Sequence, residues 1–243
     1  MAQATDGRQA RWAKHNQQRR LTILAAAVDV LEAEPVGADV HVHQIAAKAG
    51  LNRTVVYRHF TDRADLDTAI RHHIIDDLTG VLTPAVNLDG SVNEVIRRII
   101  STYVDWTVSH PALHAFAVLG GDGPFQHGTD QIAQQLTELL ELAIALLGAE
   151  LDESERALVD PLAHGLVGAV FGTVRRWVTR EPMEPSAYRL SELLTMSVWN
   201  LLDGHARRLG LEIDPDLPLT ALFASADVAA DVPAEGSAGE ATT

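Results

Sequence analysis

Apolar side chains recur every three or four residues along most of this chain, and this periodicity restricts its fold more than any other feature. The first clear example consists of Leu21, Leu24, Val28 and Leu31, and Pro35 marks its end. Such spacing places apolar side chains on one face of an α-helix. No run of alternating β-branched residues suggests a strand. We therefore expect an all-α protein of about nine helices with almost no sheet.

Helix ends follow from capping residues, glycines and prolines. Ser91 and Glu94 have the spacing of a capping box, in which two side chains satisfy free backbone amides at a helix start. The stretch 121–128 is rich in glycine and is expected to be a loop. The expected helices lie at about residues 21–34, 45–49, 53–60, 62–82, 91–109, 112–119, 132–147, 152–180 and 186–209.

Length and cysteine content limit the kinds of protein that this chain can be. The chain has 243 residues, enough for a substantial core, and no cysteine. The absence of cysteine excludes disulfides, thiolate metal sites and cysteine nucleophiles, and it suits a reducing compartment. No stretch approaches the ~18 uncharged apolar residues of a membrane-spanning helix. We expect a cytoplasmic protein without a membrane segment.

The net charge of −14 is unevenly distributed. Residues 1–75 carry ten basic and eight acidic side chains, whereas residues 76–243 carry nine and twenty-five. Such asymmetry is typical of a nucleic-acid-binding end on an acidic body, although a solvated basic tail gives the same pattern. Asp6 is the one acid among the first twenty residues. The basic residues there are Arg8, Arg11, Lys14, Arg19 and Arg20.

The segment 40–60 carries the strongest functional signal. Ala46 and Ala49 share one face of a short helix, where small side chains let a second helix cross closely. Gly50 follows, where a left-handed backbone conformation ends a helix. Asn52 is then a favourable N-cap for a second short helix, whose free amides can face phosphate. This order predicts a helix-turn-helix, in which the second helix enters the DNA major groove.

In the second short helix, Val55, Val56 and Phe60 are expected to fill the inner face, and the polar residues between them point outward. With the preceding amphipathic helix, this segment resembles the amino-terminal domain of the TetR (tetracycline-repressor-type) family of bacterial transcriptional regulators. The resemblance covers about residues 17–75, and the block Tyr57-Arg58-His59-Phe60 is its most specific part. Combined with composition, it implies four regions. They are a basic, flexible arm (1–16), a helix-turn-helix domain (17–66) with a linker helix to about 82, a ligand-binding and dimerisation domain (83–210) and a largely disordered tail (211–243).

The resemblance assigns DNA contacts residue by residue. Arg53 and Thr54, at the start of the second helix, are expected to contact base edges, where arginine pairs bidentately with guanine. Tyr57 and His59 are expected to contact phosphates or thymine methyl groups, and Arg58 either joins them or packs on the next helix. The basic arm either follows the phosphate backbone, enters the minor groove or is a solubilising tail. The expected DNA-contacting residues, with Lys48 and Arg63 as backbone clamps, are His43, Lys48, Asn52, Arg53, Thr54, Tyr57, Arg58, His59 and Arg63.

For the rest of the chain the resemblance implies a homodimer and a small-molecule site. Small residues on one helix face allow close approach of another helix, although the same faces also suit a core within one subunit. The expected dimer residues are His164, Gly165, Gly168, Gly172, Leu194, Val198 and Leu201. Aromatic side chains typically line ligand pockets but also form ordinary core. The candidate pocket residues are Tyr103, Trp106, His110, His114, Phe116, Phe125, Phe171 and Trp177.

We expect no cofactor, no metal site and no enzymatic activity. His110 and His114 have the spacing of a helical metal pair, but Pro111 interrupts it and no carboxylate partner is evident. No nucleophile elbow, phosphate loop or dinucleotide fingerprint occurs. The sequence thus predicts a ligand-responsive, homodimeric regulator, a repressor that a small molecule releases from a palindromic operator in double-stranded DNA. The alternatives are an activator, or an all-α small-molecule-binding or interaction protein that binds no operator.

Overall fold

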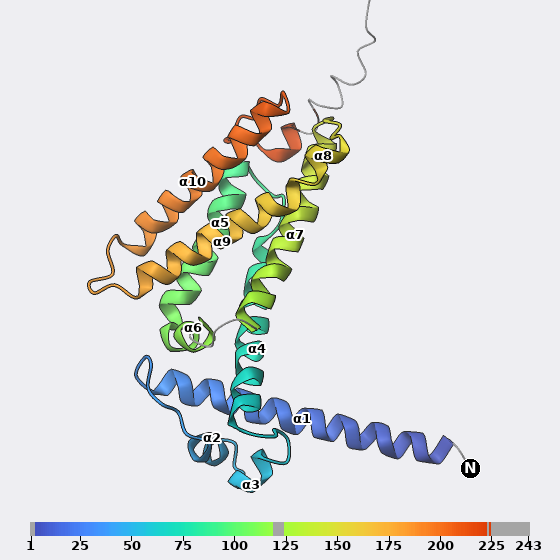
Figure 1. Ribbon diagram of the computed structural model, residues 1–243, viewed down its shortest axis with the longest axis vertical. Helices are drawn as coiled ribbons and strands as arrows, with labels where there is room; N and C mark the ends of the chain where they lie inside the picture. The colour runs from blue at the N-terminus through green and yellow to red at the C-terminus, as the bar shows by residue number, and fades with distance from the viewer. Residues whose placement is uncertain (1–2, 119–123, 223, 225–243) are drawn as a thin grey trace, which may run out of the picture. The chain divides into compact units, whose positions relative to one another are not determined.

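The computed structural model describes residues 3–118, 124–222 and 224. These residues form ten α-helices, one 3₁₀ turn and no strand (Figure 1), which confirms the all-α fold. Within them, Ser91 and Pro218 form an isolated antiparallel bridge. The elements are α1 (Gln3–Ala33), α2 (Val42–Lys48), α3 (Arg53–Val56), α4 (Arg63–Leu82), the 3₁₀ turn η1 (Thr83–Ala85), α5 (Val92–Ser109), α6 (Pro111–Val118), α7 (Pro124–Leu146), α8 (Glu153–Arg156), α9 (Val159–Val178) and α10 (Ala187–Arg208).

The chain divides into two compact units. The first comprises the chain up to Pro84 together with Thr102–Gln131 and Phe171–Ala187, and so contains α1 to α4 and α6. The second comprises Ala85–Ser101, Ile132–Val170 and the chain from Tyr188 onward. The long helices α5, α7 and α9 therefore have residues in both units, whereas the sequence suggested a boundary at the end of α4.

The first four helices surround a small apolar core, which we call the head core. Ile23 of α1, Ile45 of α2, Val56 of α3 and Ile70 of α4 are at most 1% exposed. Burying an aliphatic side chain of this size contributes about 1.5–3 kcal/mol. α1 packs against α2, α4 and α6, and α2 packs against α3. This packing fixes the short helix α3 although it is too short to be stable alone.

Helix α1 is longer than the sequence suggested, since it begins at Gln3. Apolar periodicity begins only at Leu21, which is why a flexible arm was expected at residues 1–16. The segment from Gln3 to Gln18, however, contains many strong helix formers and no proline. Helix propensity therefore accounts for the extension of α1 toward the amino terminus. Residues 3–16 are thus helical, although the sequence suggested no helix there.

Two further helix boundaries differ from the expected ones. α7 begins at Pro124 instead of residue 132, since proline suits a first helical turn; residues 119–123 of the expected loop lie outside the described part. The expected single helix 152–180 is divided into α8 and α9. Pro161 has no amide hydrogen, and its ring would clash with the carbonyl four residues earlier in a continuous helix. The chain therefore turns after Arg156, and Pro161 falls in the first turn of α9.

Part of the segment that was expected to be a disordered tail packs against the start of α5. Leu219 and Leu222 form a buried cluster with Val95. The Asn93 amide donates to the Pro215 carbonyl at 3.1 Å. Two leucines three residues apart suffice to dock this segment, although its average composition resembles that of a disordered tail. Residues 225–243 of the expected tail lie outside the described part.

One helical stretch of the described residues, Glu153–Val178, is long and apolar enough to span a membrane by length and composition alone. No such stretch was expected from the sequence, in which no run approaches ~18 uncharged apolar residues. Leu166 and Val174 in this stretch are at most 3% exposed. Core helices of globular proteins meet the same criteria, so this observation is weak evidence for membrane insertion.

Candidate nucleic-acid interface

Helix α2, the turn at Gly50 and α3 form the helix-turn-helix expected from the sequence. Gly50 has φ +67°, a left-handed backbone conformation that residues with a Cβ rarely adopt. The Leu51 amide donates to the Ala46 carbonyl at 2.8 Å, and the Gly50 amide donates to the Ala47 carbonyl at 3.1 Å. These two bonds are those of a Schellman motif, which satisfies the last carbonyls of α2. The turn thereby directs the chain from α2 into α3.

Helix α3 begins at Arg53, directly after Asn52, whose backbone is extended as in an N-cap. The position of the N-cap is as expected, but the Asn52 side chain accepts no hydrogen bond from the helix. The first turn closes instead through the Val55 amide, which donates to the Asn52 carbonyl at 2.8 Å. The Asn52 carboxamide is exposed and not used for capping.

The side chains of α3 and the turn after it separate into an inner and an outer set. Val56 and Phe60 are at most 1% exposed and belong to the head core. Val55 is only half-buried, which is less than the sequence suggested. On the outer side, the Arg53 guanidinium lies 5.5 Å from the centre of the Tyr57 ring, a cation–π distance. The residues exposed to solvent are Asn52, Arg53, Thr54 and Arg58, and the half-buried ones are Tyr57 and His59.

Arg20 of α1 fixes the end of this outer segment. Its Nη1 donates to the His59 carbonyl at 2.7 Å, and its guanidinium lies 4.2 Å from the centre of the Phe60 ring. Hydrogen bonds from a charged donor are about twice as strong as neutral ones. Sequence reasoning missed this role of Arg20, because its partner is 39 residues away in the chain. The basic character of residue 20 was the only signal.

His59 lies in a positively charged environment. Partial burial lowers its pKa, and the positive charges of Arg19 and Arg20, together with His15, lower it further. These basic groups of α1 therefore lie near the end of the α3 segment. The combined surface favours anions such as DNA phosphates.

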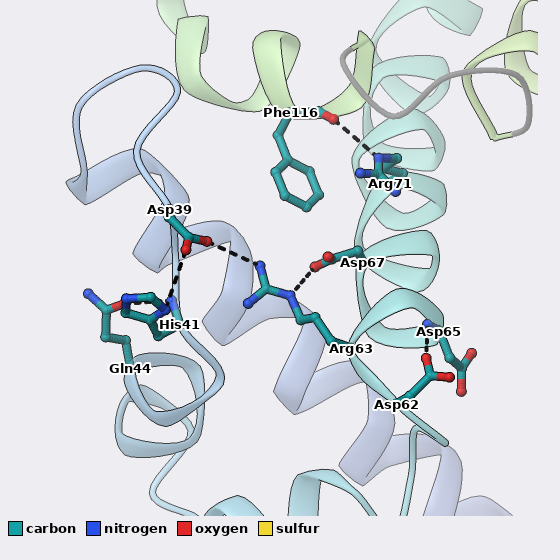
Figure 2. Close-up of polar contacts among 9 residues, drawn as sticks. All are labelled: Asp39, His41, Gln44, Asp62, Arg63, Asp65, Asp67, Arg71 and Phe116. Atoms are coloured by element: carbon teal, nitrogen blue, oxygen red, sulfur yellow. Dashed lines mark hydrogen bonds and ion pairs between the residues drawn. The ribbon is translucent and has the colours of Figure 1, made fainter.

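Two basic residues that were expected to clamp the DNA backbone are paired with carboxylates. The Lys48 Nζ lies 3.2 Å from an Asp29 carboxylate oxygen. Figure 2 shows Arg63 between two aspartates: its Nε lies 2.7 Å from Asp67, and its Nη2 lies 4.0 Å from Asp39. Asp39 precedes α2, so Arg63 connects the start of α4 to the segment between α1 and α2. Arg63 therefore has carboxylate partners within the chain, which argues against the backbone contact that the resemblance implies for it.

Replacing Arg63 by glutamine is expected to lower the free energy of unfolding by less than about 1 kcal/mol, because its ion pairs are partly exposed. The dependence of DNA affinity on salt is expected to stay unchanged. A lost phosphate contact would instead reduce the slope of log K against log salt concentration by about 0.9. Fluorescence anisotropy titrations on a labelled duplex measure this slope, and Asp67→Asn is the matched control for the loss of stability.

His43 lies on the exposed side of α2. Its ring stacks on that of His41, with the ring centres 5.6 Å apart. The His41 amide donates to the Gln44 side chain at 2.7 Å, which completes a capping box at the start of α2. Gln44 in turn donates to Glu34 at 3.0 Å. This network fixes the start of α2 and with it the position of His43.

Comparison with known proteins agrees with this geometry. The model of the tetR family of bacterial regulatory proteins matches residues 23–70. An uncharacterized HTH-type transcriptional regulator of Mycobacterium tuberculosis is 27% identical over 203 residues, which cover 82% of this chain and 84% of the relative. A TetR-family transcriptional regulator from Streptomyces coelicolor has the same fold, with a TM-score of 0.62, 19% identity and coverage of 91% and 92%. The chain belongs to the TetR family.

This TetR-family protein is a DNA-binding transcriptional regulator. Its amino-terminal part is also similar to the HTH-type transcriptional repressor LfrR of Mycolicibacterium smegmatis, with 34% identity over 86 residues. That alignment covers 35% of this chain and 44% of the repressor. The similarity therefore concerns the DNA-binding end and not the whole of either protein.

Several candidate pocket residues of this TetR-family protein meet in the first unit. The Tyr103 hydroxyl lies 3.1 Å from His114 Nε2, and the Tyr103 and Phe171 rings lie 4.3 Å apart. Burial raises the pKa of Tyr103, and burial and then the charge of Arg175 lower the pKa of His114 to about 4. Both groups are therefore neutral near pH 7. The Trp106 and His110 rings lie 5.4 Å apart.

The remaining candidate pocket residues have other partners. His110 Nδ1 lies 2.5 Å from Glu32 of α1, a carboxylate partner that was not evident from the sequence. The Arg71 guanidinium lies 4.9 Å from the centre of the Phe116 ring, a cation–π distance. The Trp177 indole donates to the Pro185 carbonyl at 2.6 Å. The side chain of Phe125 lies outside the described part. Of the described residues, no three metal-binding side chains form a cluster.

The residues expected at the dimer interface differ in accessibility. Gly165 and Gly168 of α9 are exposed in the second unit, as is Leu201 of α10, which is 49% exposed. His164 and Val198 are half-buried, and Gly172 is exposed. Leu194 is only 4% exposed. Leu194 therefore packs inside its own chain, as in the alternative that these faces form a core within one subunit.

Proposed function

We propose that this regulator is a cytoplasmic, homodimeric repressor that binds a palindromic operator and dissociates from it when a small molecule binds. The observation that carries the proposal is the exposed row of polar side chains on and after α3, which the buried Val56 and Phe60 fix beside the turn at Gly50. The similarity of the DNA-binding end to a named repressor supports repression over activation. In this proposal regulation needs binding alone and no catalytic step.

The outer residues of the α3 segment are the proposed reading surface. Arg53 and Thr54 contact base edges, because the first residues of a recognition helix reach deepest into the major groove. Tyr57 and His59 contact the phosphate backbone, and the positive environment of His59 supports this role. Asn52, whose carboxamide does not cap α3, and the exposed His43 and Arg58 flank these contacts. Lys48 adds positive charge in its partly exposed pair with Asp29.

A second copy of the chain is the proposed partner of exposed faces on α9 and α10. Gly165 and Gly168 leave the α9 backbone open to close approach by another helix. On α10, the apolar side chains of Leu193, Met196 and Leu201 are 48%, 57% and 49% exposed. A twofold axis through such a face would present two recognition helices to one duplex, each reading half of a palindrome.

The proposed effector site lies around Tyr103, His114 and Phe171. An apolar, aromatic lining with few polar groups is the usual character of a small-molecule site. His114 lies on α6, and α6 packs against both α1 and α4. Glu32 of α1 and His110 add a polar contact at this junction. A ligand that displaced α6 would thus act on α1 and α4, which hold the helix-turn-helix. Operator affinity would then fall by the difference between the ligand's binding free energies for the DNA-free and the DNA-bound protein.

Footprinting on the DNA that flanks the protein's own gene tests this proposal. The expected result is a twofold-symmetric protected region that shrinks as salt rises, because phosphate contacts release counterions. Replacing Arg53 by glutamine is expected to reduce discrimination at one base pair of each half-site by about 1–3 kcal/mol. Arg97→Gln, on the exposed surface of α5, is the charge-matched control. No protected region, or the same discrimination by Arg53→Gln as by the wild type, would overturn the proposal.

A further inference from the structure

One fully buried hydroxyl group in the first unit lacks a hydrogen-bond partner. Thr107 of α5 is 0% exposed, and its Oγ1 forms no hydrogen bond with any residue that the structure describes. A threonine within a helix often donates to the carbonyl four residues earlier, as the buried Thr137 and Thr195 do at 3.0 and 2.8 Å. A buried polar group without a partner is destabilising, so Thr107 needs an explanation other than packing.

Two further polar groups lie near the Thr107 hydroxyl, among aromatic rings. Thr107 follows Tyr103 by four residues on α5, so both side chains lie on the same face of the helix. The Thr107 hydroxyl opposes the rise that burial causes in the pKa of Tyr103, although it forms no hydrogen bond. The Tyr103 hydroxyl instead pairs with His114 Nε2 at 3.1 Å, and the Phe171 ring lies 4.3 Å from the Tyr103 ring. A hydroxyl, a phenol and an imidazole therefore meet in an apolar interior.

The interior around these groups offers no partner to a charged molecule. Among the described residues, every aspartate, glutamate, lysine and arginine is at least partly exposed. Arg175 of α9, whose charge helps to lower the pKa of His114, is itself exposed. Burying a charge without a counter-ion costs far more than burying a neutral polar group. A molecule that enters here should therefore be uncharged.

We propose that Thr107, Tyr103 and His114 form the polar end of the effector site, and that the effector is an uncharged molecule with an aromatic body and one oxygen acceptor. This inference rests on the proposed function, in which a small molecule acts at this site, and adds the chemical class of that molecule. The Thr107 hydroxyl has a hydrogen left to donate, which a phenol or ketone oxygen can accept. The rings of Tyr103 and Phe171 supply the aromatic contacts for the body of the ligand.

Matched pairs of small probes test the role of the Thr107 hydroxyl. The oxygen-bearing probes are 4-methylphenol and 2-naphthol, which are uncharged at pH 7, and their counterparts without oxygen are toluene and naphthalene. Equilibrium dialysis against the full-length protein gives the dissociation constant of each. The test variant is Thr107→Val, which removes the hydroxyl and preserves the shape of the side chain. Thr195→Val is the matched control, because Thr195 is also buried in a helix but its hydroxyl has a partner.

We expect the affinity of each phenol, relative to its hydrocarbon, to fall by about fivefold in Thr107→Val, which is the effect of losing one neutral hydrogen bond. The same ratio should change by less than about twofold in Thr195→Val, and Thr107→Ser, which keeps a hydroxyl, should retain it. The urea midpoint should rise in Thr107→Val, because an unsatisfied polar atom is removed. An unchanged ratio for both probe pairs, no binding of either phenol, or a lower urea midpoint in Thr107→Val would overturn the inference.

Charged probes with the same rings test the preference for an uncharged ligand. At pH 7, 4-methylbenzoate and 2-naphthoate each carry one negative charge. They are expected to bind at least about tenfold more weakly than the corresponding phenols, because no buried cation compensates that charge. Equal or tighter binding of the carboxylates would overturn the proposed class of ligand, and its loss in Arg175→Gln would assign the binding to the Arg175 guanidinium.

Titration of the phenols into the complex of the wild type with its footprinted operator separates two kinds of failure. If the phenols bind with the expected dependence on Thr107 but leave operator affinity unchanged, the ligand site stands and release of the operator from this site fails. If an operator is protected but phenol binding does not depend on Thr107, the proposed class of ligand fails and operator binding stands.

Discussion

Replacing Phe60 by alanine is expected to disrupt the head core and abolish operator binding. The Phe60 side chain is 1% exposed. Truncation of a buried phenylalanine to alanine usually costs about 3–5 kcal/mol, because apolar contacts are lost and a cavity remains. The Arg20 guanidinium, 4.2 Å from the ring, also loses its cation–π partner. Since Arg20 holds the carbonyl of His59, DNA affinity should fall further than the loss of stability alone predicts.

Urea unfolding, followed by circular dichroism, measures the cost in stability, and anisotropy titrations measure DNA affinity. Leu21→Ala is the matched control, because Leu21 lies on α1 with its side chain 44% exposed. It is expected to cost less than about 0.5 kcal/mol. Phe60→Leu keeps an apolar side chain but removes the ring, so it should restore most of the stability and less of the affinity. A cost below about 1 kcal/mol for Phe60→Ala would contradict the place of Phe60 in the head core.

The helix-turn-helix could be predicted because its determinants are local in sequence. Gly50 takes the positive φ that ends α2, and the bonds that close the turn join residues 46–51. Val56 and Phe60 are buried as predicted. The turn depends on neighbours within about two helical turns, and the apolar pattern selects Val56 and Phe60 for the core that α1, α2 and α4 complete. The pattern of residue types was therefore enough to predict the turn and the burial of Val56 and Phe60, although it also placed the half-buried Val55 on the inner face.

The pairing of charges could not be predicted, because the partners are distant in sequence. Arg20 contacts residue 59, and His110 contacts Glu32, 78 residues away. A sequence gives the sign of each charge but not which carboxylate the fold brings within ion-pair distance. Lys48 was therefore expected to clamp phosphate, whereas the structure pairs it with Asp29.

The orientation of α1 shows a third limit. The apolar stripe was expected to include Leu21 and Val28. In the structure Leu21 is 44% exposed, whereas Ile23 and Val30 are at most 9% exposed. Apolar residues occur on several sides of this segment, and periodicity alone does not select among adjacent faces. The contacts of α1 with α2, α4 and α6 make that selection.

Acidification is expected to destabilise this protein through His114, the second large effect. His114 is 3% exposed beside Tyr103, and burial, followed by the charge of Arg175, lowers its pKa from 6.5 to about 4. Below pH 6.5 the unfolded chain binds a proton that the folded chain excludes. Stability is therefore complete above about pH 6.5 and falls by about 1.4 kcal/mol per pH unit until His114 protonates in the folded state near pH 4. The total loss is about 3 kcal/mol.

Urea unfolding at a series of pH values between 4 and 8 checks this expectation, with His114→Gln as the test variant. Glutamine is neutral throughout this range and can still hydrogen-bond the Tyr103 hydroxyl. The variant should therefore be less stable than the wild type at pH 7, yet lose about 3 kcal/mol less on acidification. His205→Gln, at an exposed position of α10, should keep the pH dependence of the wild type. If His114→Gln kept that dependence as well, the acid sensitivity would belong to other groups, and the neutral, buried state of His114 would be disproved.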